Sequence, residues 1–238
     1  MEHVKIKICG ITNWPDARRA CEAGADFLGF NFFAGSPRCI SVRKARAIVR
    51  RLPKRVAAVG VFVNESPCAI SEIAEAVGLH YVQLHGEESP AEISRLGRSI
   101  PVIKAIRVRS SVPAALSASR LRPFESASAF LLDGFEPGNR GGTGKTFDWS
   151  LAAAVRRRAV RIFLAGGLTP ANVADAIRAA RPYAVDVCSG VEVSLGKKDP
   201  AKLEAFARAV RDARRAPARR VARVASAPRA RKKAMAKR

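Results

Sequence analysis

The chain has 238 residues, of which 48% are hydrophobic and five are cysteines, and its formal net charge is +23. This length fits one large α/β domain or two small ones. Five cysteines without paired spacing argue against a disulfide framework and for a reducing compartment, and nothing in the spacing of cysteine and histidine suggests a metal site. No secretory signal or apolar run of about 18 residues is present, so we expect a soluble, cytoplasmic protein with no membrane partner.

The first half of the chain alternates strand-like and helix-like runs. Residues 4–8 alternate apolar and basic side chains, as a short strand does. Helix starts are marked by Asn13 or Thr12 and by Ser41, and helix ends by Gly78 and Gly97. The patterns predict strands at 4–8, 26–31, 57–63, 80–84 and 102–106, and helices at 14–23, 42–50, 67–77, 89–96 and 112–119.

The second half repeats this pattern up to residue 213. Strands are predicted at 129–132, 161–165 and 184–187, and helices at 149–157, 170–179 (with Thr169 as the cap) and 200–213. Eight strands alternating with eight helices imply parallel pairing through right-handed crossovers. A single closed (β/α)₈ (TIM) barrel over residues 1–213 leaves no sheet edge. An open doubly wound sheet is the alternative, but no GxGxxG motif follows the first strand.

The positive charge is concentrated at the C-terminal end. From Arg214 to Arg238 there are eleven basic side chains and no acidic one, nearly half of the net charge. A segment rich in Ala, Arg, Lys and Pro has little to bury, so we predict that residues 214–238 form a disordered tail. The tail offers nonspecific contact to polyanions through counterion release, but no aromatic residue supports base stacking.

Polar residues and glycines collect where the predicted strands end. In a barrel these C-terminal ends form one rim, which is where active sites lie. A thiol there suits acid–base or nucleophilic chemistry. The rim positions are Cys9, the segment 36–38, Asn64, the segment 83–86, Arg107, Asp133, the pair Gly166 and Gly167, and the pair Ser189 and Gly190.

Two glycine-containing segments are suited to binding phosphate. Residues 165–170 join the seventh strand to a helix, and residues 188–192 leave the eighth strand. Glycine lets the backbone approach an anion closely, and barrel phosphate sites commonly use these two loops. Residues 141–146 superficially resemble a nucleotide-binding P-loop, but the GxxxxGK[ST] spacing fails, so Lys145 is not taken as a nucleotide ligand. We expect instead a loop that closes over a substrate beside Asp133.

Taken together and in order, these motifs resemble phosphoribosylanthranilate isomerase, a (β/α)₈-barrel enzyme family of tryptophan biosynthesis. The resemblance spans nearly all of residues 4–192 and leaves the tail outside. The matching segments are KICGIT at 7–12, GFNFFAGSPR at 29–38, VGVFVN at 59–64, VQLHGEE at 82–88, LLD at 131–133, GGTGKTFDW at 141–149, LAGGLTPANV at 164–173 and DVCSGVE at 186–192.

The resemblance implies an intramolecular aldose–ketose isomerase that needs no cofactor. It implies that Cys9 as thiolate is the general base and that Asp133, protonated, is the general acid. It further implies that Arg38 holds the substrate carboxylate, where a guanidinium fork is suited, and that Asp186 contacts the substrate amine. Phosphate binding falls to Gly166, Gly167, Ser189 and Gly190, largely through backbone N–H groups. His85 is left out of catalysis as a residue that supports the rim, and a monomer is expected.

Two positions depart from the family pattern, and two other functions stay open. Cys188 stands where the family usually has serine, and Gly134 where alanine is common. The related phosphoribosyl isomerase of histidine biosynthesis is one alternative, although it typically has aspartate in place of Cys9 and needs two phosphate sites. A basic nucleic-acid-binding barrel is the other, and it would require a basic face on the folded domain.

Overall fold

The computed structural model describes residues 3–108, 121–134, 149 and 161–213. Eight parallel strands close into a barrel in chain order, because β1 (Lys5–Ile8) pairs with both β2 (Phe27–Asn31) and β8 (Ala184–Val187). The remaining strands are β3 (Ala57–Phe62), β4 (Tyr81–Leu84), β5 (Val102–Val108), β6 (Ala129–Gly134) and β7 (Ile162–Leu164). The predicted closed barrel is therefore confirmed, and the open sheet is wrong.

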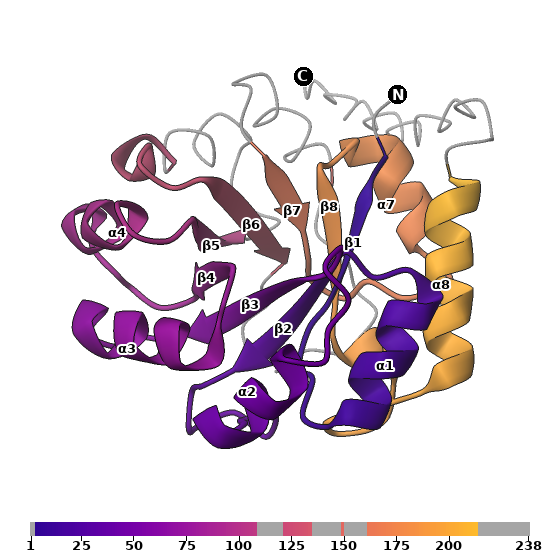
Figure 1. Ribbon diagram of the computed structural model, residues 1–238. Coiled ribbons are helices and arrows are strands. Elements are labelled where there is room, and N and C mark those ends of the chain that lie inside the picture. Colours follow the sequence, from indigo (N-terminus) through magenta and orange to yellow (C-terminus); the bar gives the residue numbers. More distant parts are fainter. Residues whose placement is uncertain (1–2, 109–120, 135–148, 150–160, 214–238) are drawn as a thin grey trace, which may run out of the picture.

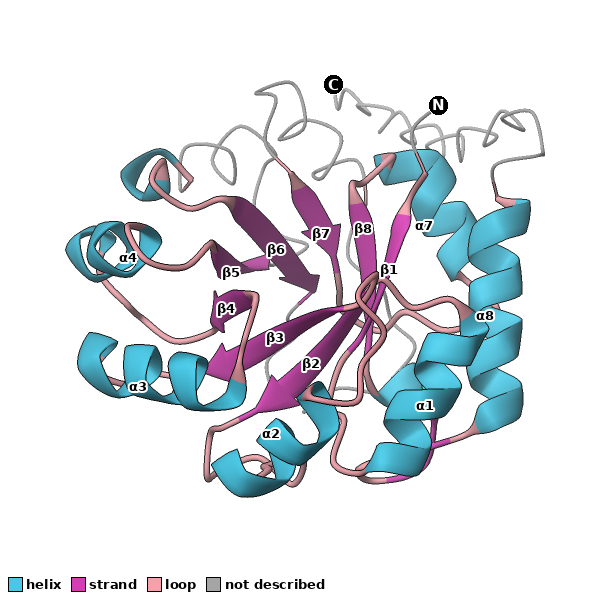
Figure 2. Ribbon diagram, viewed as in Figure 1, coloured by secondary structure: helices cyan, strands magenta, loops and turns pink. Residues whose placement is uncertain are grey.

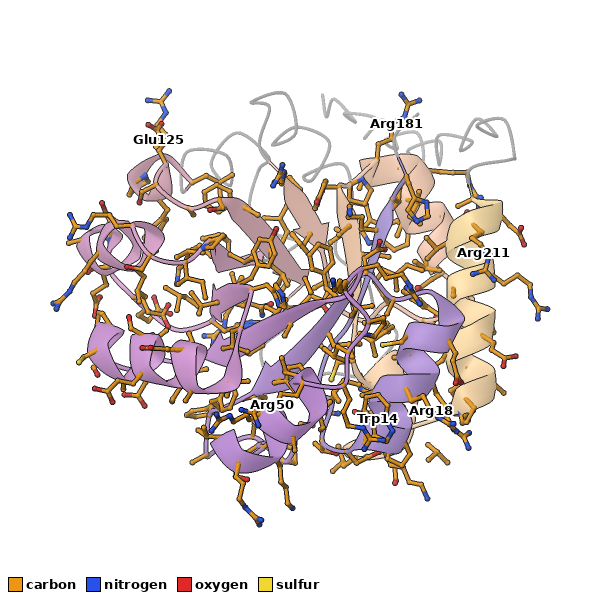
Figure 3. The ribbon with its side chains drawn as sticks, in the orientation of Figure 1. Trp14, Arg18, Arg50, Glu125, Arg181 and Arg211 are labelled. Carbon is orange, nitrogen blue, oxygen red and sulfur yellow. The ribbon has the colours of Figure 1, made fainter. Side chains whose placement is uncertain are left out.

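Helices surround the strands on the outside of the barrel (Figure 2). Those in the described residues are α1 (Trp14–Ala23), α2 (Val42–Val49), α3 (Pro67–Val77), α4 (Pro90–Gly97), α7 (Val173–Ala180) and α8 (Pro200–Asp212). Labelled surface residues such as Arg18, Arg50 and Arg211 extend away from the strands (Figure 3). None of the described helices is both long and apolar enough to cross a membrane.

Most helix boundaries follow the predicted caps. The side chain of Asn13 accepts from Asp16 N at the start of α1, and Ser89 and Glu92 form a reciprocal capping box at α4. The sequence predicted that α4 ends before Gly97. In the structure Gly97 is instead the last residue of α4, and the C-cap is Arg98 in a right-handed conformation.

Three further differences concern the last third of the chain. The helix predicted at 170–179 begins only at Val173, because the Asn172 side chain is engaged by Thr169 N and Gly167 O and closes the preceding loop first. Two short segments, the 3₁₀ turn η2 (Ser189–Val191) and the hairpin β9 (Glu192–Ser194) with β10 (Lys197–Lys198), were not predicted. The helices predicted at 112–119 and 149–157, the loop 141–146 with Lys145, and the tail 214–238 lie outside the described residues, Trp149 excepted.

Two apolar layers stabilise the barrel. The larger layer lies between the strands and the helices, where Leu28, Phe30 and Phe206 are fully buried. The smaller layer fills the barrel itself, where Phe27, Phe163 and Tyr183 meet edge to face at centroid distances of 5.2 and 5.6 Å. Because strand residues alternate, the same inward rows continue upward from this packed layer to the polar rim.

Replacing Phe163 by alanine should lower the free energy of unfolding by about 3–5 kcal/mol, because a fully buried ring leaves a cavity inside the barrel. Urea denaturation followed by circular dichroism measures the change. Leu195→Ala is the control, since this side chain is 71% exposed and its loss should cost less than about 0.5 kcal/mol. Equal effects of the two substitutions would contradict the assigned packing.

Candidate active site

The inward row of β1 carries the groups at the centre of the site. Lys5, Lys7 and Cys9 alternate with outward Ile6 and Ile8, so Cys9 lies above Lys7 at the C-terminal end of the strand. On β8, Asp186 is in register with Lys7. Cys188 follows the end of that strand as Cys9 follows β1. The seam between β1 and β8 thus places a lysine, a carboxylate and two thiols side by side.

Lys7 and Asp186 form an ion pair inside the barrel. Lys7 is fully buried, and its Nζ donates to Asp186 Oδ1 at 2.9 Å. Burial raises the pKa of Asp186 to about 6, although the charge of Lys7 acts in the opposite direction. The charges of Cys9 and Asp133 also raise this pKa, so Asp186 lies within electrostatic reach of both predicted catalytic groups.

Cys9 is surrounded by groups that favour its thiolate. A hydrogen bond from Cys188 and the positive charges of Lys7 and Lys198 hold the pKa of Cys9 well below its ordinary value, against the effect of burial. The same hydrogen bond, with burial, raises the pKa of Cys188. Cys9 is therefore the stronger acid of the pair and Cys188 the weaker one.

Arg38 is held by a carboxylate from the far end of the chain. Its Nε and Nη2 donate to Glu192 Oε1 and Oε2 at 2.8 and 2.6 Å. Lys198 donates to the same Oε1 at 3.0 Å and to the Cys188 carbonyl at 3.1 Å. Two cations therefore share one buried carboxylate, and the guanidinium edge formed by Nη1 and Nη2 has donors that can bind a further acceptor.

Asp133 lies at the end of β6 beside His85. His85 Nε2 is 3.4 Å from Asp133 Oδ2, and its Nδ1 is 3.1 Å from Gln83 Nε2. If Gln83 donates to Nδ1, the proton of the imidazole is on Nε2 and faces Asp133. The structure thus places His85, which sequence reasoning left out of catalysis, in contact with the predicted acid.

The two phosphate segments pack directly against one another and against β6. A Cβ on Gly190 would lie 1.9 Å from Leu168 O, and one on Gly166 would lie 2.4 Å from Gly134 N. Only glycine permits these approaches. Among the described residues, the backbone N–H groups of Gly166, Gly167, Ser189 and Gly190 meet no protein acceptor. The structure thus brings together all four predicted phosphate-binding residues as a cluster of donors.

Sequence reasoning did not predict a role for four side chains of this candidate site. Lys7, Glu192 and Lys198 were not singled out, and His85 was set aside. A signal existed for Lys7 and His85, because each lies on the inward side of its strand by simple alternation, Lys7 two residues before Cys9. Glu192 and Lys198 gave no such signal, since they depend on the unpredicted hairpin. The described residues contain no cluster of His, Cys, Asp or Glu that suits a metal ion.

The surroundings of Cys9 predict an unusual alkylation profile. Its rate of reaction with iodoacetamide should reach a plateau at a lower pH than that of an ordinary cysteine, which gains reactivity up to a pKa of about 8.5. Lys7→Met should move the midpoint upward, because it removes one of the cations beside the sulfur. Peptide mass spectrometry measures the Cys9 rate against pH. An identical midpoint in the variant would remove Lys7 from this role.

The chain is similar over most of its length to known isomerases. The family model described as N-(5'phosphoribosyl)anthranilate (PRA) isomerase matches residues 6–209. The N-(5'-phosphoribosyl)anthranilate isomerase of Pseudomonas putida strain W619 is 51% identical over 213 residues, which are 90% of this chain and 100% of that protein. The crystal structure of phosphoribosyl anthranilate isomerase from Thermotoga maritima is 44% identical with a TM-score of 0.82, over 88% of this chain and 99% of that one.

Two further solved structures bear on ligand and assembly. One is phosphoribosyl anthranilate isomerase in complex with reduced 1-(o-carboxyphenylamino)-1-deoxyribulose 5-phosphate, 42% identical with a TM-score of 0.77 over 88% of this chain and 99% of that one. The other consists of monomers generated from the dimeric Thermotoga maritima enzyme, 42% identical with a TM-score of 0.78 over the same shares. With the family model and a relative above 50% identity both covering most of its length, the chain belongs to the phosphoribosylanthranilate isomerase family of aldose–ketose isomerases.

Proposed function

We propose that this protein catalyses the Amadori rearrangement of N-(5-phospho-β-D-ribosyl)anthranilate to 1-(2-carboxyphenylamino)-1-deoxy-D-ribulose 5-phosphate in L-tryptophan biosynthesis. The observation that carries the proposal is the Cys9 thiolate held by Lys7 and Lys198 at one side of the rim, with the Asp133 carboxyl on another strand. The reaction needs a base and an acid in one site, and this pair supplies both.

The first step is opening of the ribose ring. Asp133 in its protonated form donates to the ring oxygen, and the anthranilate nitrogen supplies its electron pair to form an imine at C1′. His85, 3.4 Å from the carboxyl, orients the donor. The Cys9 thiolate then removes the proton from C2′, and the resulting enolamine tautomerises to the ketone. C2′ is oxidised and C1′ is reduced within one molecule.

The remaining residues hold the substrate. The donor cluster of Gly166, Gly167, Ser189 and Gly190 suits the 5′-phosphate. Arg38 is preorganised by Glu192 and presents its second edge to the anthranilate carboxylate. Lys7 bonds only Oδ1 of Asp186, and Oδ2 accepts from the substrate amine.

The domain bounds, the role of the tail, the oligomeric state and the cellular location are proposals of the same kind. We place the activity in residues 1–213 and treat 214–238 as a dispensable tail with nonspecific polyanion contact, which assays of a chain truncated after residue 213 would test. A monomer stays a prediction for sedimentation analysis, because the Thermotoga maritima enzyme is dimeric. Cytoplasmic location likewise stays a prediction for fractionation.

Cys9→Ala and Asp133→Asn should each lower kcat by about 10²- to 10⁴-fold, because each removes one proton-transfer group. The assay follows the loss of fluorescence of phosphoribosylanthranilate generated in situ. Circular dichroism shows that the variants are folded, and the histidine-pathway substrate serves as a negative control. Wild-type turnover by either variant would remove that residue from the mechanism, and turnover of the control substrate would favour the alternative isomerase.

Arg38→Met should raise KM by about tenfold or more while kcat changes less, since one charge-assisted bond to the substrate is lost. Steady-state kinetics in the same assay separate the two constants. Arg50→Met is the matched control, because this exposed side chain lies at the C-terminal end of α2, at the far end of the helix from the rim loop that carries Arg38. Unchanged kinetic constants for Arg38→Met would disprove substrate binding by Arg38.

A further inference from the structure

The two rim thiols lie side by side at the C-terminal ends of two paired strands, β1 and β8. Ile8 pairs with Val187, Cys9 N donates to Val187 O at 2.9 Å, and Cys9 and Cys188 are the next residues on each strand. Neighbouring strands are about 4.8 Å apart, inside the roughly 4.4–6.8 Å between the Cα atoms of a disulfide. The two thiols also act on each other's ionisation, since their interaction lowers the pKa of Cys9 and raises that of Cys188.

Both cysteines are also partly exposed. Cys9 and Cys188 each have intermediate exposure at the barrel mouth, whereas Cys21 lies on the buried face of α1. An anionic, accessible sulfur next to a second thiol is the arrangement found in redox-responsive cysteine pairs. Cys39 and Cys68 are more exposed, but neither is among the groups that shift the pKa of Cys9 or Cys188.

The charges around the pair favour a two-stage reaction. In the resting state the anionic Cys9 raises the pKa of Cys188, while Lys198 and Arg38 act to lower it. When Cys9 is converted into a neutral sulfenic acid, its negative charge disappears but the two cations remain. Cys188 then becomes the thiolate, 3.9 Å from Lys198 Nζ, at the moment when a nucleophile is required.

We propose that Cys9 and Cys188 are a modification site for hydroperoxides and form a reversible disulfide. The Cys9 thiolate attacks a peroxide oxygen, the O–O bond breaks, and hydroxide leaves and is protonated to water. The sulfur is thereby oxidised to sulfenic acid. Cys188 then attacks that sulfur, the S–O bond breaks, and a second water leaves. With hydrogen peroxide the sum is two thiols and one peroxide giving one disulfide and two waters, and a dithiol reductant reverses it.

The residue at position 188 decides between reversible and irreversible oxidation. With serine there, the usual family residue, the sulfenic acid has no resolving sulfur and proceeds to sulfinic acid. The consequence for activity rests on the proposed function: a Cys9 sulfur in a disulfide has no thiolate to remove the C2′ proton, so turnover stops until the bond is reduced.

The decisive experiment treats the full chain with hydrogen peroxide, blocks free thiols and maps tryptic peptides by mass spectrometry. Cleavage after Arg18 or Arg19 separates Cys9 from Cys21. We expect a linked pair of peptides carrying Cys9 and Cys188, lighter by two hydrogen atoms and separated by dithiothreitol. Cys188→Ser should give Cys9 sulfinic acid and no linkage. Cys68→Ser, which removes an exposed thiol elsewhere, should keep the linkage.

Several outcomes would overturn the proposal. In one, Cys9 and Cys188 remain reduced after Cys39 and Cys68 have been oxidised. In another, Cys9 is linked to a cysteine other than Cys188. If Cys188→Ser does not fold, the wild-type map still decides. Isomerase activity is read separately, before and after peroxide and after reduction. A linkage without activity in the untreated protein would sink the proposed function alone, and activity without linkage would sink this inference alone.

Discussion

The buried ion pair between Lys7 and Asp186 is the interaction on which the barrel mouth depends. It joins β1 to β8, the seam that closes the barrel, and the Lys7 side chain is wholly enclosed. An ammonium group in such a place costs several kcal/mol unless it is paired, so the register of the two strands is tied to this contact. The same charge lies beneath Cys9 and favours its thiolate. Closure of the barrel and stabilisation of the Cys9 thiolate therefore share one residue, Lys7.

The two sides of the rim have different electrostatic character. Lys7, Lys198 and Arg38 gather around Cys9 and Cys188, while Asp133 faces His85 and the glycine loops. Cations beside a thiol favour its ionised form, which is the form that a base requires. Placing the cations on one side only gives Cys9 and Asp133 different surroundings, which is what the proposed base and acid roles require. Asp186 lies between the two sides, in electrostatic reach of both.

The sequence was sufficient for the barrel and for the position of the rim, because strand alternation and helix caps are local. Every predicted strand is present, and Asn13, Ser41 and Ser89 lie where the helices begin. The start of α7 was wrong because the Asn172 side chain bonds within the loop rather than capping the predicted helix. The ionic network was out of reach, since Lys7 and Asp186 are 179 residues apart and Arg38 and Glu192 are 154 apart. Only the closed register brings such partners together.

The charges of this network also explain why an oxidised pair would be easily reduced. Lys7, Lys198 and Arg38 face two carboxylates, Asp186 and Glu192, and the Cys9 thiolate supplies the third negative charge. A disulfide would remove that charge and leave one cation without a counterion in a largely buried cluster. Stabilising the thiolate of a dithiol makes its disulfide a stronger oxidant, so cellular thiols regenerate the reduced form more readily. The same charges that stabilise the Cys9 thiolate thus favour the reduced form of the proposed cysteine pair.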